Sequence, residues 1–307
     1  MILLFHAIIQ LSVVLIISPL VVGVINRTKA FFGGRQGPPL LQPYLDLWRL
    51  FHKGTVQSTV TTWLFRAGPV VTLVTTLLAA LLVPLATSHA PLSFTGDLLL
   101  FIYLLALGRF ALVLSSLDTG SAFEGMGVAR EITFGCLSEP AMFFDLLVLA
   151  KVSHSLEMQS LLGGPHLVTW QAAGAPLLLV LTSWFLLTLA DNCRIPFDDP
   201  NTHLELTMIH EVIVLDHSGP MLGILQLASA AKLFLFSAVI VRLAVPLDLL
   251  GPILVWPVFM AATLLMGVIL GVVESVMARL QMTLVPHVLT AAGVIGAFGL
   301  VLEVATP

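Results

Sequence analysis

Residues 191–220 read DNCRIPFDDPNTHLELTMIHEVIVLDHSGP, and this stretch decides how the rest of the chain is interpreted. It holds six carboxylates and three of the nine histidines, in a chain that is only 10% charged. An apolar run, 176–190, ends where the stretch begins, and another starts at Met221. We interpret it as a polar segment that closes a proton-accessible cavity at a membrane surface and meets a soluble partner there. The alternative is an ordinary solvated loop between two spans.

The composition indicates an all-α, polytopic membrane protein with a single domain, 1–307. Hydrophobic residues make up 58% of the 307 residues, which is more than a water-soluble domain of this size carries. Apolar runs of about the 20 residues that a membrane span needs occur eight times. They are 1–25, 68–86, 98–117, 134–152, 170–190, 221–245, 253–273 and 285–301.

Basic residues predict how the spans are oriented. If the N-terminus lies outside, most of the lysines and arginines fall on the cytoplasmic side, as the positive-inside rule requires. The loops 26–66 and 191–220 are then both cytoplasmic. Within the first of them, residues 43–53 place Tyr44, Trp48 and Phe51 on one helical stripe. That pattern is typical of an amphipathic helix lying in the membrane interface, although an ordinary juxtamembrane helix has a similar sequence.

The chain shows no sequence motif for a cofactor of its own. Its two cysteines, Cys136 and Cys193, lie far apart and outside any CxxC spacing, which argues against an iron–sulfur cluster or a zinc site. We expect a helix from residue 201 or 202 to Leu215, with His203, His210 and His217 recurring every seven residues near one face. Helical zinc ligands are usually four apart. We therefore expect no metal and no catalytic residue in this chain, and no nucleic-acid partner.

Four ionisable residues fall inside predicted spans: Arg109, Glu139, Asp145 and Lys232. Such groups cost about 2.5–3.5 kcal/mol each on insertion scales and are functional candidates by default. The alternative is that they form buried ion pairs that only fix the helix register.

An acidic series leads towards these charges. Glu139 precedes Pro140, which removes a helical amide and opens a turn beside the carboxylate. On one helix, Glu124 and Glu131 share a face and Glu139 is offset by about 80°. The three could form an acidic file from the surface into the membrane.

Several motifs resemble the family of the membrane subunit 1 of respiratory complex I. One is Asn192-x-Arg194-x-Pro196-Phe197-Asp198-x-Pro200-x4-Glu205-Leu206. Others are Gly33-x-Arg35-x-Gly37-Pro38, Leu41-Gln42-Pro43 with Asp46, Arg130-Glu131, and Glu274-x4-Arg279. Together they run from about residue 25 to residue 280.

Further features resemble the branch of that family that serves membrane-bound [NiFe] hydrogenases of the hydrogenase-4 and formate hydrogenlyase type. They include Ser116-x-Asp118-Thr119-Gly120-Ser121 and the run 198–211. Thr202 and His203 stand where the quinone-linked branch carries acidic residues, which argues against a quinone in this chain.

The resemblance implies a non-catalytic membrane anchor and proton-coupling subunit in a bacterial or archaeal inner membrane. Its implied partners are [NiFe] hydrogenase-type large and small subunits, which carry the [NiFe] centre and iron–sulfur clusters, and antiporter-like membrane subunits. The candidate proton path comprises Glu124, Glu131, Glu139, Asp145, Glu205, Glu211, Lys232 and Arg109. The candidates for arm docking or for lining the cavity are Arg35, Gln42, Asp46, Arg130, Asp191, Arg194, Asp198, Asp199, His203, His210, Glu274 and Arg279.

Two other functions stay open. One is the equivalent subunit of an NADH:quinone oxidoreductase, with a quinone headgroup between the first loop and residues 191–220. The other is a stand-alone ion transporter, which the buried charges alone would suit. An inverted repeat would favour the transporter, and the sequence shows no clear repeat.

Overall fold

The structure is a computed structural model that describes residues 2–163, 166–198, 210–251 and 253–305. Within these ranges the regular elements are all helical. They are α1 (Ile2–Phe32), α2 (Gln42–Phe51), α3 (Trp63–Leu82), α4 (Asp97–Leu117), α5 (Ala122–Ser153), α6 (Met158–Gly163), α7 (His166–Asp191), α8 (His210–Ile213), α9 (Gly219–Ala244), the 3-10 helix η1 (Leu247–Leu249), α10 (Val255–Val276) and α11 (Val285–Ala305).

Eight helices of the described chain are long and apolar enough to cross a membrane: α1, α3, α4, α5, α7, α9, α10 and α11. This confirms the all-α fold and the eight predicted spans. Two helices extend far beyond their predicted ends, and the other boundaries differ by up to about five residues. The helix α1 continues to Phe32, and α5 begins at Ala122 instead of residue 134. At 1.5 Å per residue α5 is about 48 Å long, so one end of it extends beyond a hydrocarbon core of about 30 Å.

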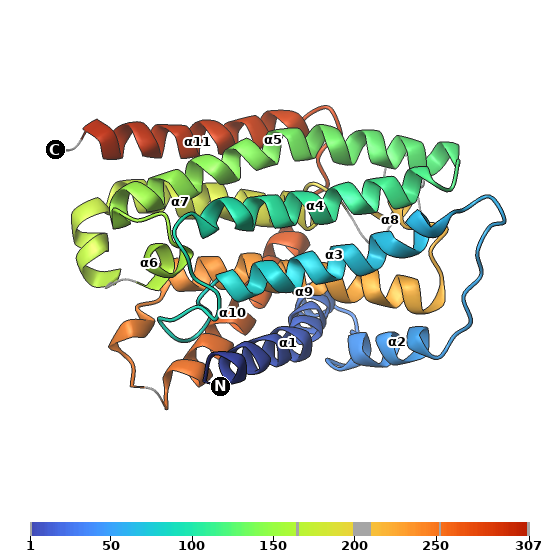
Figure 1. Ribbon diagram of the computed structural model, residues 1–307, viewed down its shortest axis with the longest axis horizontal. Helices are drawn as coiled ribbons and strands as arrows, with labels where there is room; N and C mark the ends of the chain where they lie inside the picture. The colour runs from blue at the N-terminus through green and yellow to red at the C-terminus, as the bar shows by residue number, and fades with distance from the viewer. Residues whose placement is uncertain (1, 164–165, 199–209, 252, 306–307) are drawn as a thin grey trace.

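The helix α9 forms the centre of the bundle. It contacts α1, α2, α3, α6, α7 and α10, and 72% of its most apolar window is buried. Around it, α3 packs on α4, α1 packs on α10, and α11 packs on both α5 and α7. Figure 1 shows the long helices running along one direction, with the N- and C-termini at the same end of the bundle.

The opposite end, which we call the loop end, carries α2, α8 and the loops that join the spans there (Figure 1). Residues 52–62 cross this end as an extended strap. Ser218 exchanges hydrogen bonds with the backbone N–H and carbonyl of Val56, at 3.0 and 2.9 Å. Asp118 accepts hydrogen bonds from the backbone and hydroxyl of Thr62. The segment that leads into α9 is therefore fixed to the strap.

The predicted amphipathic helix 43–53 is present as α2. No residue of α2 is buried, and the helix contacts α1 and α9. The Tyr44 hydroxyl donates to the carbonyl of Ile16 in α1, so α2 is tied to the bundle by a polar contact. Its place in the membrane interface stays a prediction.

The helix predicted from residue 201 or 202 to Leu215 lies partly outside the described residues. The described part, α8, ends at Ile213, and a turn follows. His217 therefore lies beyond the helix and does not share a helical face with His210.

Candidate functional site: a buried charge cluster between cavities

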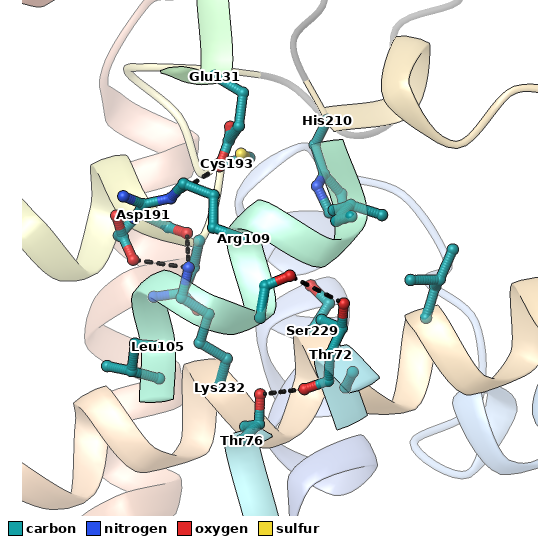
Figure 2. Close-up of a pocket in the computed structure, with 15 residues that line it drawn as sticks. Thr72, Thr76, Leu105, Arg109, Glu131, Asp191, Cys193, His210, Ser229 and Lys232 are labelled. Atoms are coloured by element: carbon teal, nitrogen blue, oxygen red, sulfur yellow. Dashed lines mark hydrogen bonds and ion pairs between the residues drawn. The ribbon is translucent and has the colours of Figure 1, made fainter. Parts of the chain in front are cut away.

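Asp191, the last residue of α7, receives polar contacts from three other helices. Arg109 of α4 lies 2.5 Å from Oδ1, and Lys232 of α9 lies 2.6 Å from Oδ2. The Ser138 hydroxyl of α5 donates to Oδ1 at 3.0 Å. The Lys232 ammonium also donates to the Asp191 carbonyl at 2.9 Å. Figure 2 shows the two cations converging on this carboxylate.

Arg109 joins two more carboxylates to this centre. Its Nε lies 3.3 Å from Glu131, and its Nη1 lies 2.6 Å from Glu139, both on α5. We call these five residues the Arg109 cluster: Arg109, Glu131, Glu139, Asp191 and Lys232. It contains three carboxylates and two cations, so the fully ionised cluster carries one excess negative charge.

The members of the Arg109 cluster differ in exposure. The side chains of Asp191 and Arg109 are 9% and 10% exposed, whereas the side chain of Glu139 is 37% exposed. Glu139 lies within a span and opens to the outside of the bundle, where a lipid or a neighbouring protein would be. A carboxylate in that position needs a polar neighbour or a proton.

Gly135 makes room for the guanidinium. A Cβ at this position would lie 2.5 Å from Nη1 of Arg109, which is closer than a real Cβ approaches another atom. The absence of a side chain at residue 135 therefore lets the Arg109 guanidinium lie against α5, and a side chain there would displace it.

Three adjacent spaces lie between the loop end and the Arg109 cluster. The loop-end chamber has a volume of about 490 Å³ and is bounded by Asp46, Arg194, His210, His217 and Ser229 among others. The inner cavity, about 50 Å³, shares His210 and Ser229 with the chamber and reaches Arg109 and Lys232. Figure 2 shows His210 and Ser229 at the boundary of this inner cavity.

The third space, the seam cavity, has a volume of about 20 Å³ and shares Glu131, Asp191 and Cys193 with the inner cavity. Ser138 and two residues of α11, Val285 and Leu289, close it. Since one water needs roughly 10–15 Å³ of free volume, all three spaces are large enough for water. Spaces that can hold water, with shared wall residues, therefore lie between the loop end and the charges.

His210 is placed where it can respond to the Arg109 cluster. Burial lowers the pKa of its imidazole, with Lys232 and Arg194 acting in the same direction and Glu131 and Asp198 opposing it. The histidine is therefore neutral at pH 7, and a neutral ring can both accept and donate a proton. Burial also raises the pKa of the Cys193 thiol beside it, which keeps this cysteine unreactive.

The motif residues of segment 191–198 form a clamp at the loop end. Lys29 and Arg194 both pair with the buried Glu274, at 2.8 and 3.5 Å. Arg279 pairs with Asp198 at 3.0 Å. These contacts tie the segment to α1 and to the end of α10. The motif residues thereby hold the backbone that presents Asp191 to the bundle.

Several predicted site residues lie elsewhere. Asp145 and Glu124 are both fully buried and stand apart from the Arg109 cluster. Glu124 accepts hydrogen bonds from the Thr119 hydroxyl and from the amide of Asp216 at the loop end. Asp199, His203 and Glu205 lie outside the described residues.

The remaining predicted residues lie at the loop end. Gln42 donates to Asp46 at 2.8 Å on α2, and Asp46 and Glu211 line the loop-end chamber. Arg35 is exposed, and Arg130 is partly buried on α5.

The sequence did not single out Ser138, Ser229 or Gly135. A serine or glycine within an apolar span carries little signal until its neighbours on other helices are known. No group of three or more histidine, cysteine or acidic residues that could hold a metal occurs among the residues that the structure describes.

The fold and the Arg109 cluster define a polytopic helical membrane protein with ionisable groups beside small cavities inside its bundle. The sequence profile of the NADH dehydrogenase family (NADHdh) matches residues 5–304. The chain therefore belongs to this family, which includes the membrane subunit 1 of respiratory complex I.

Several known proteins are similar to the chain. Hydrogenase-4 component C of Escherichia coli K12 is 31% identical over 292 residues, covering 93% of this chain and 91% of that protein. Formate hydrogenlyase subunit 4 of the same organism is 30% identical, covering 92% and 93%. One NADH-quinone oxidoreductase subunit of Burkholderia vietnamiensis is 25% identical, covering 66% and 59%.

A solved structure is similar to the chain throughout its length. A subunit of the membrane-bound sulfane sulfur reductase, an archaeal respiratory membrane complex, superposes with a TM-score of 0.85 at 19% identity. The match covers 99% of this chain and 100% of that subunit, and it confirms the fold.

Proposed function

We propose that this chain is the membrane anchor and proton-coupling subunit of a hydrogenase-4-like or formate hydrogenlyase-like complex. The two most extensive sequence matches support the type of complex, because both cover more than nine tenths of the chain. In this proposal the loop end faces the cytoplasm and docks the [NiFe] large and small subunits. Antiporter-like subunits lie beside the bundle within the membrane.

The Arg109 cluster is the observation that carries the coupling role. It lines the inner cavity, which shares His210 and Ser229 with the loop-end chamber, and it includes Glu139, whose side chain opens to the side of the bundle. A change of charge in the docked arm would alter the field at Asp191 and Lys232. Since Arg109 bridges Asp191 and Glu139, such a change would reach Glu139 through direct ion pairs.

The excess negative charge supports proton movement over a purely structural role. Protonation of one carboxylate leaves two carboxylates for two cations, so the Arg109 cluster can accept a proton without leaving a buried cation unpaired. Loss of that proton restores the excess charge. The cluster can therefore alternate between two states that differ by one proton.

The replacement Glu139→Gln tests the proposal, because it keeps the shape and the hydrogen bond to Arg109 but removes the titratable group. We expect the complex to assemble and hydrogenase turnover to persist, while the number of protons moved per electron falls. The two rates are measured side by side in membrane vesicles. Glu157→Gln is the matched control, because Glu157 lies at the other end of the bundle, hydrogen-bonded to Thr95. An unchanged proton-to-electron ratio in Glu139→Gln would show that the path does not run through Glu139.

A quinone-linked function is the second candidate, and the size of the loop-end chamber favours it. A volume of about 490 Å³ falls within the roughly 300–1,000 Å³ of small-molecule sites. Extraction and analysis of quinone from the purified complex separates the two candidates. Stoichiometric quinone together with flavin-containing NADH dehydrogenase subunits would favour the second. Proton flux through the isolated chain in liposomes would instead favour a stand-alone transporter.

A further inference from the structure

Asp145 forms a second buried polar site, separate from the Arg109 cluster. It lies on α5 where α7 and α11 meet, and none of its surface is exposed. Ser183 of α7 lies 2.7 Å from its Oδ2, and Oδ1 has no hydrogen-bond partner among the described residues. Glu139, the nearest residue of the Arg109 cluster on α5, is six residues away, or about 9 Å along the helix axis.

The hydrogen atoms around Ser183 indicate the protonation state of Asp145. The Ser183 oxygen lies 2.7 Å from Oδ2 of Asp145 and 3.1 Å from the carbonyl oxygen of Ala292 in α11. A hydroxyl has only one hydrogen to donate. If Asp145 is ionised, the two acceptor oxygens must share this one hydrogen in a three-centre bond. If Oδ2 carries a proton, Asp145 donates to Ser183 and Ser183 donates to Ala292, so both contacts are hydrogen bonds.

The described parts of α5, α7 and α11 offer no counter-charge to an ionised Asp145. Their other titratable groups are Glu124, Arg130, Glu131, Cys136, Glu139 and Lys151 on α5, Asp191 on α7, and His287 and Glu303 on α11. None of them forms an ion pair with Asp145, whose polar contact within the described chain is with Ser183. A lone carboxylate at membrane depth is costly, whereas the neutral acid is tolerated.

The packing of α11 encloses this acid. A Cβ on Gly296 would lie 2.6 Å from Oδ1, so residue 296 must be a glycine for α11 to cover the carboxyl group. The opposite face of α11 is apolar and exposed: Val294 is 64% and Phe298 is 55% exposed. One helix therefore separates Asp145 from whatever surrounds the bundle.

We propose that Asp145 is a proton-binding site distinct from the Arg109 cluster, and that it holds a proton at rest under the cover of α11. The seam cavity, which reaches from Asp191 to Val285 and Leu289 of α11, lies on the cluster side of this site. Release of the proton needs one water to enter along the seam. The water takes the proton from Oδ2 and becomes hydronium, and the carboxylate that remains accepts the hydrogen bond of Ser183.

Infrared spectroscopy of the purified complex tests the proposal without relying on its activity. The difference between spectra in H₂O and D₂O contains the carboxylic C=O band of every exchangeable acid. We expect one such band in the parent to be absent in Asp145→Asn and retained in the Glu157→Gln control. An identical set of bands in the parent and Asp145→Asn would overturn the proposal, because Asp145 would then be ionised. A band that appears only after sodium is removed would make the site a cation site and would also overturn it.

Gly296→Ala keeps the test decisive if Asp145→Asn does not assemble. The added methyl group would press on Oδ1 and should shift the same band. An unshifted set of bands in Gly296→Ala would contradict the proposal. These outcomes are independent of the Glu139→Gln ratio, so either proposal can fail while the other stands.

Discussion

Removal of the Asp191 charge should destabilise the protein mainly through Lys232. In Asp191→Asn, Arg109 still pairs with Glu131 and Glu139, at 3.3 and 2.6 Å. Lys232 keeps the backbone carbonyl of residue 191, at 2.9 Å, the new side-chain amide oxygen and the ring of Phe236, at 5.9 Å, but it loses its carboxylate partner. Leaving a buried charge without its partner costs about 3–5 kcal/mol. Since the Lys232 side chain is 20% exposed, we expect the lower end, about 3 kcal/mol.

The second replacement, Lys232→Met, should cost less. Asp191 keeps Arg109 at 2.5 Å and the hydroxyl of Ser138 at 3.0 Å. The loss is then one charge-assisted contact, about 2 kcal/mol. In the double variant no cation of the cluster is left unpaired, because Arg109 retains two carboxylates. The double variant should therefore cost about 3 kcal/mol in place of the sum of about 5, a coupling energy of about 2 kcal/mol.

Thermal unfolding of the purified complex measures this cycle. A change of about 3 kcal/mol should lower the apparent Tm by roughly 5–10 °C. As a control, Lys232→Met is combined with Glu157→Gln, which lies at the other end of the bundle and should be additive. Strict additivity of Asp191→Asn and Lys232→Met would refute the reasoning, because the two side chains would then not share a buried ion pair.

Two further predictions concern the packing around the charges. His217 stacks on Phe65 and contacts Ser115. Burial lowers the pKa of its imidazole to about 4, whereas the pKa in the unfolded chain is about 6.5. The unfolded chain therefore binds a proton at His217 more readily than the folded protein does. The free energy of unfolding should therefore be highest above pH 6.5 and fall by up to about 3 kcal/mol as the pH drops to 4. Hydrogen exchange in residues 210–219 should speed up over this range. In His217→Gln, most of this pH dependence should be lost. Gly135→Ala should displace the Arg109 guanidinium and destabilise the protein by about 1–3 kcal/mol, as measured by thermal unfolding. It should also lower the proton-to-electron ratio. If neither value changes, the Arg109 guanidinium does not lie as close to residue 135 as described.

Much of the fold could be predicted from the sequence. The apolar runs predicted eight spans because a bilayer requires a minimum length of apolar helix, and that requirement acts on each segment separately. Charges within these runs are rare, so Arg109, Glu139, Asp145 and Lys232 could be identified as buried before their partners were known. The apolar run bounded the span at residue 134, because Glu124 and Glu131 broke the pattern, and only the proposed acidic file allowed for a helix that continues through them.

The arrangement of the site was harder to predict. Asp191 directly follows an apolar run, and we assigned it to the docking segment. The structure has α7 continue through Asp191, so its carboxylate turns into the bundle and meets Arg109. The acidic file was only partly recovered: Glu131 and Glu139 share Arg109, whereas Glu124 is bound to Thr119 at the loop end. Helical spacing fixes positions on one helix, and it contains no information about the neighbouring helix.

The charge balance of the Arg109 cluster distinguishes a purely structural role from a role in proton movement. If the Arg109 cluster only fixed the helix register, each buried cation would need one carboxylate, and the third would add desolvation cost without a gain. The third carboxylate is Glu139 by exposure, because its side chain is 37% exposed, against 15% for Glu131 and 9% for Asp191. Its charge must be balanced either by a proton or by a cation of an adjacent subunit. If a proton balances the charge of Glu139, Glu139→Gln should leave assembly intact and impair coupling. If a cation of an adjacent subunit balances it, the same replacement should impair assembly. The two roles of this carboxylate therefore predict opposite results for one variant.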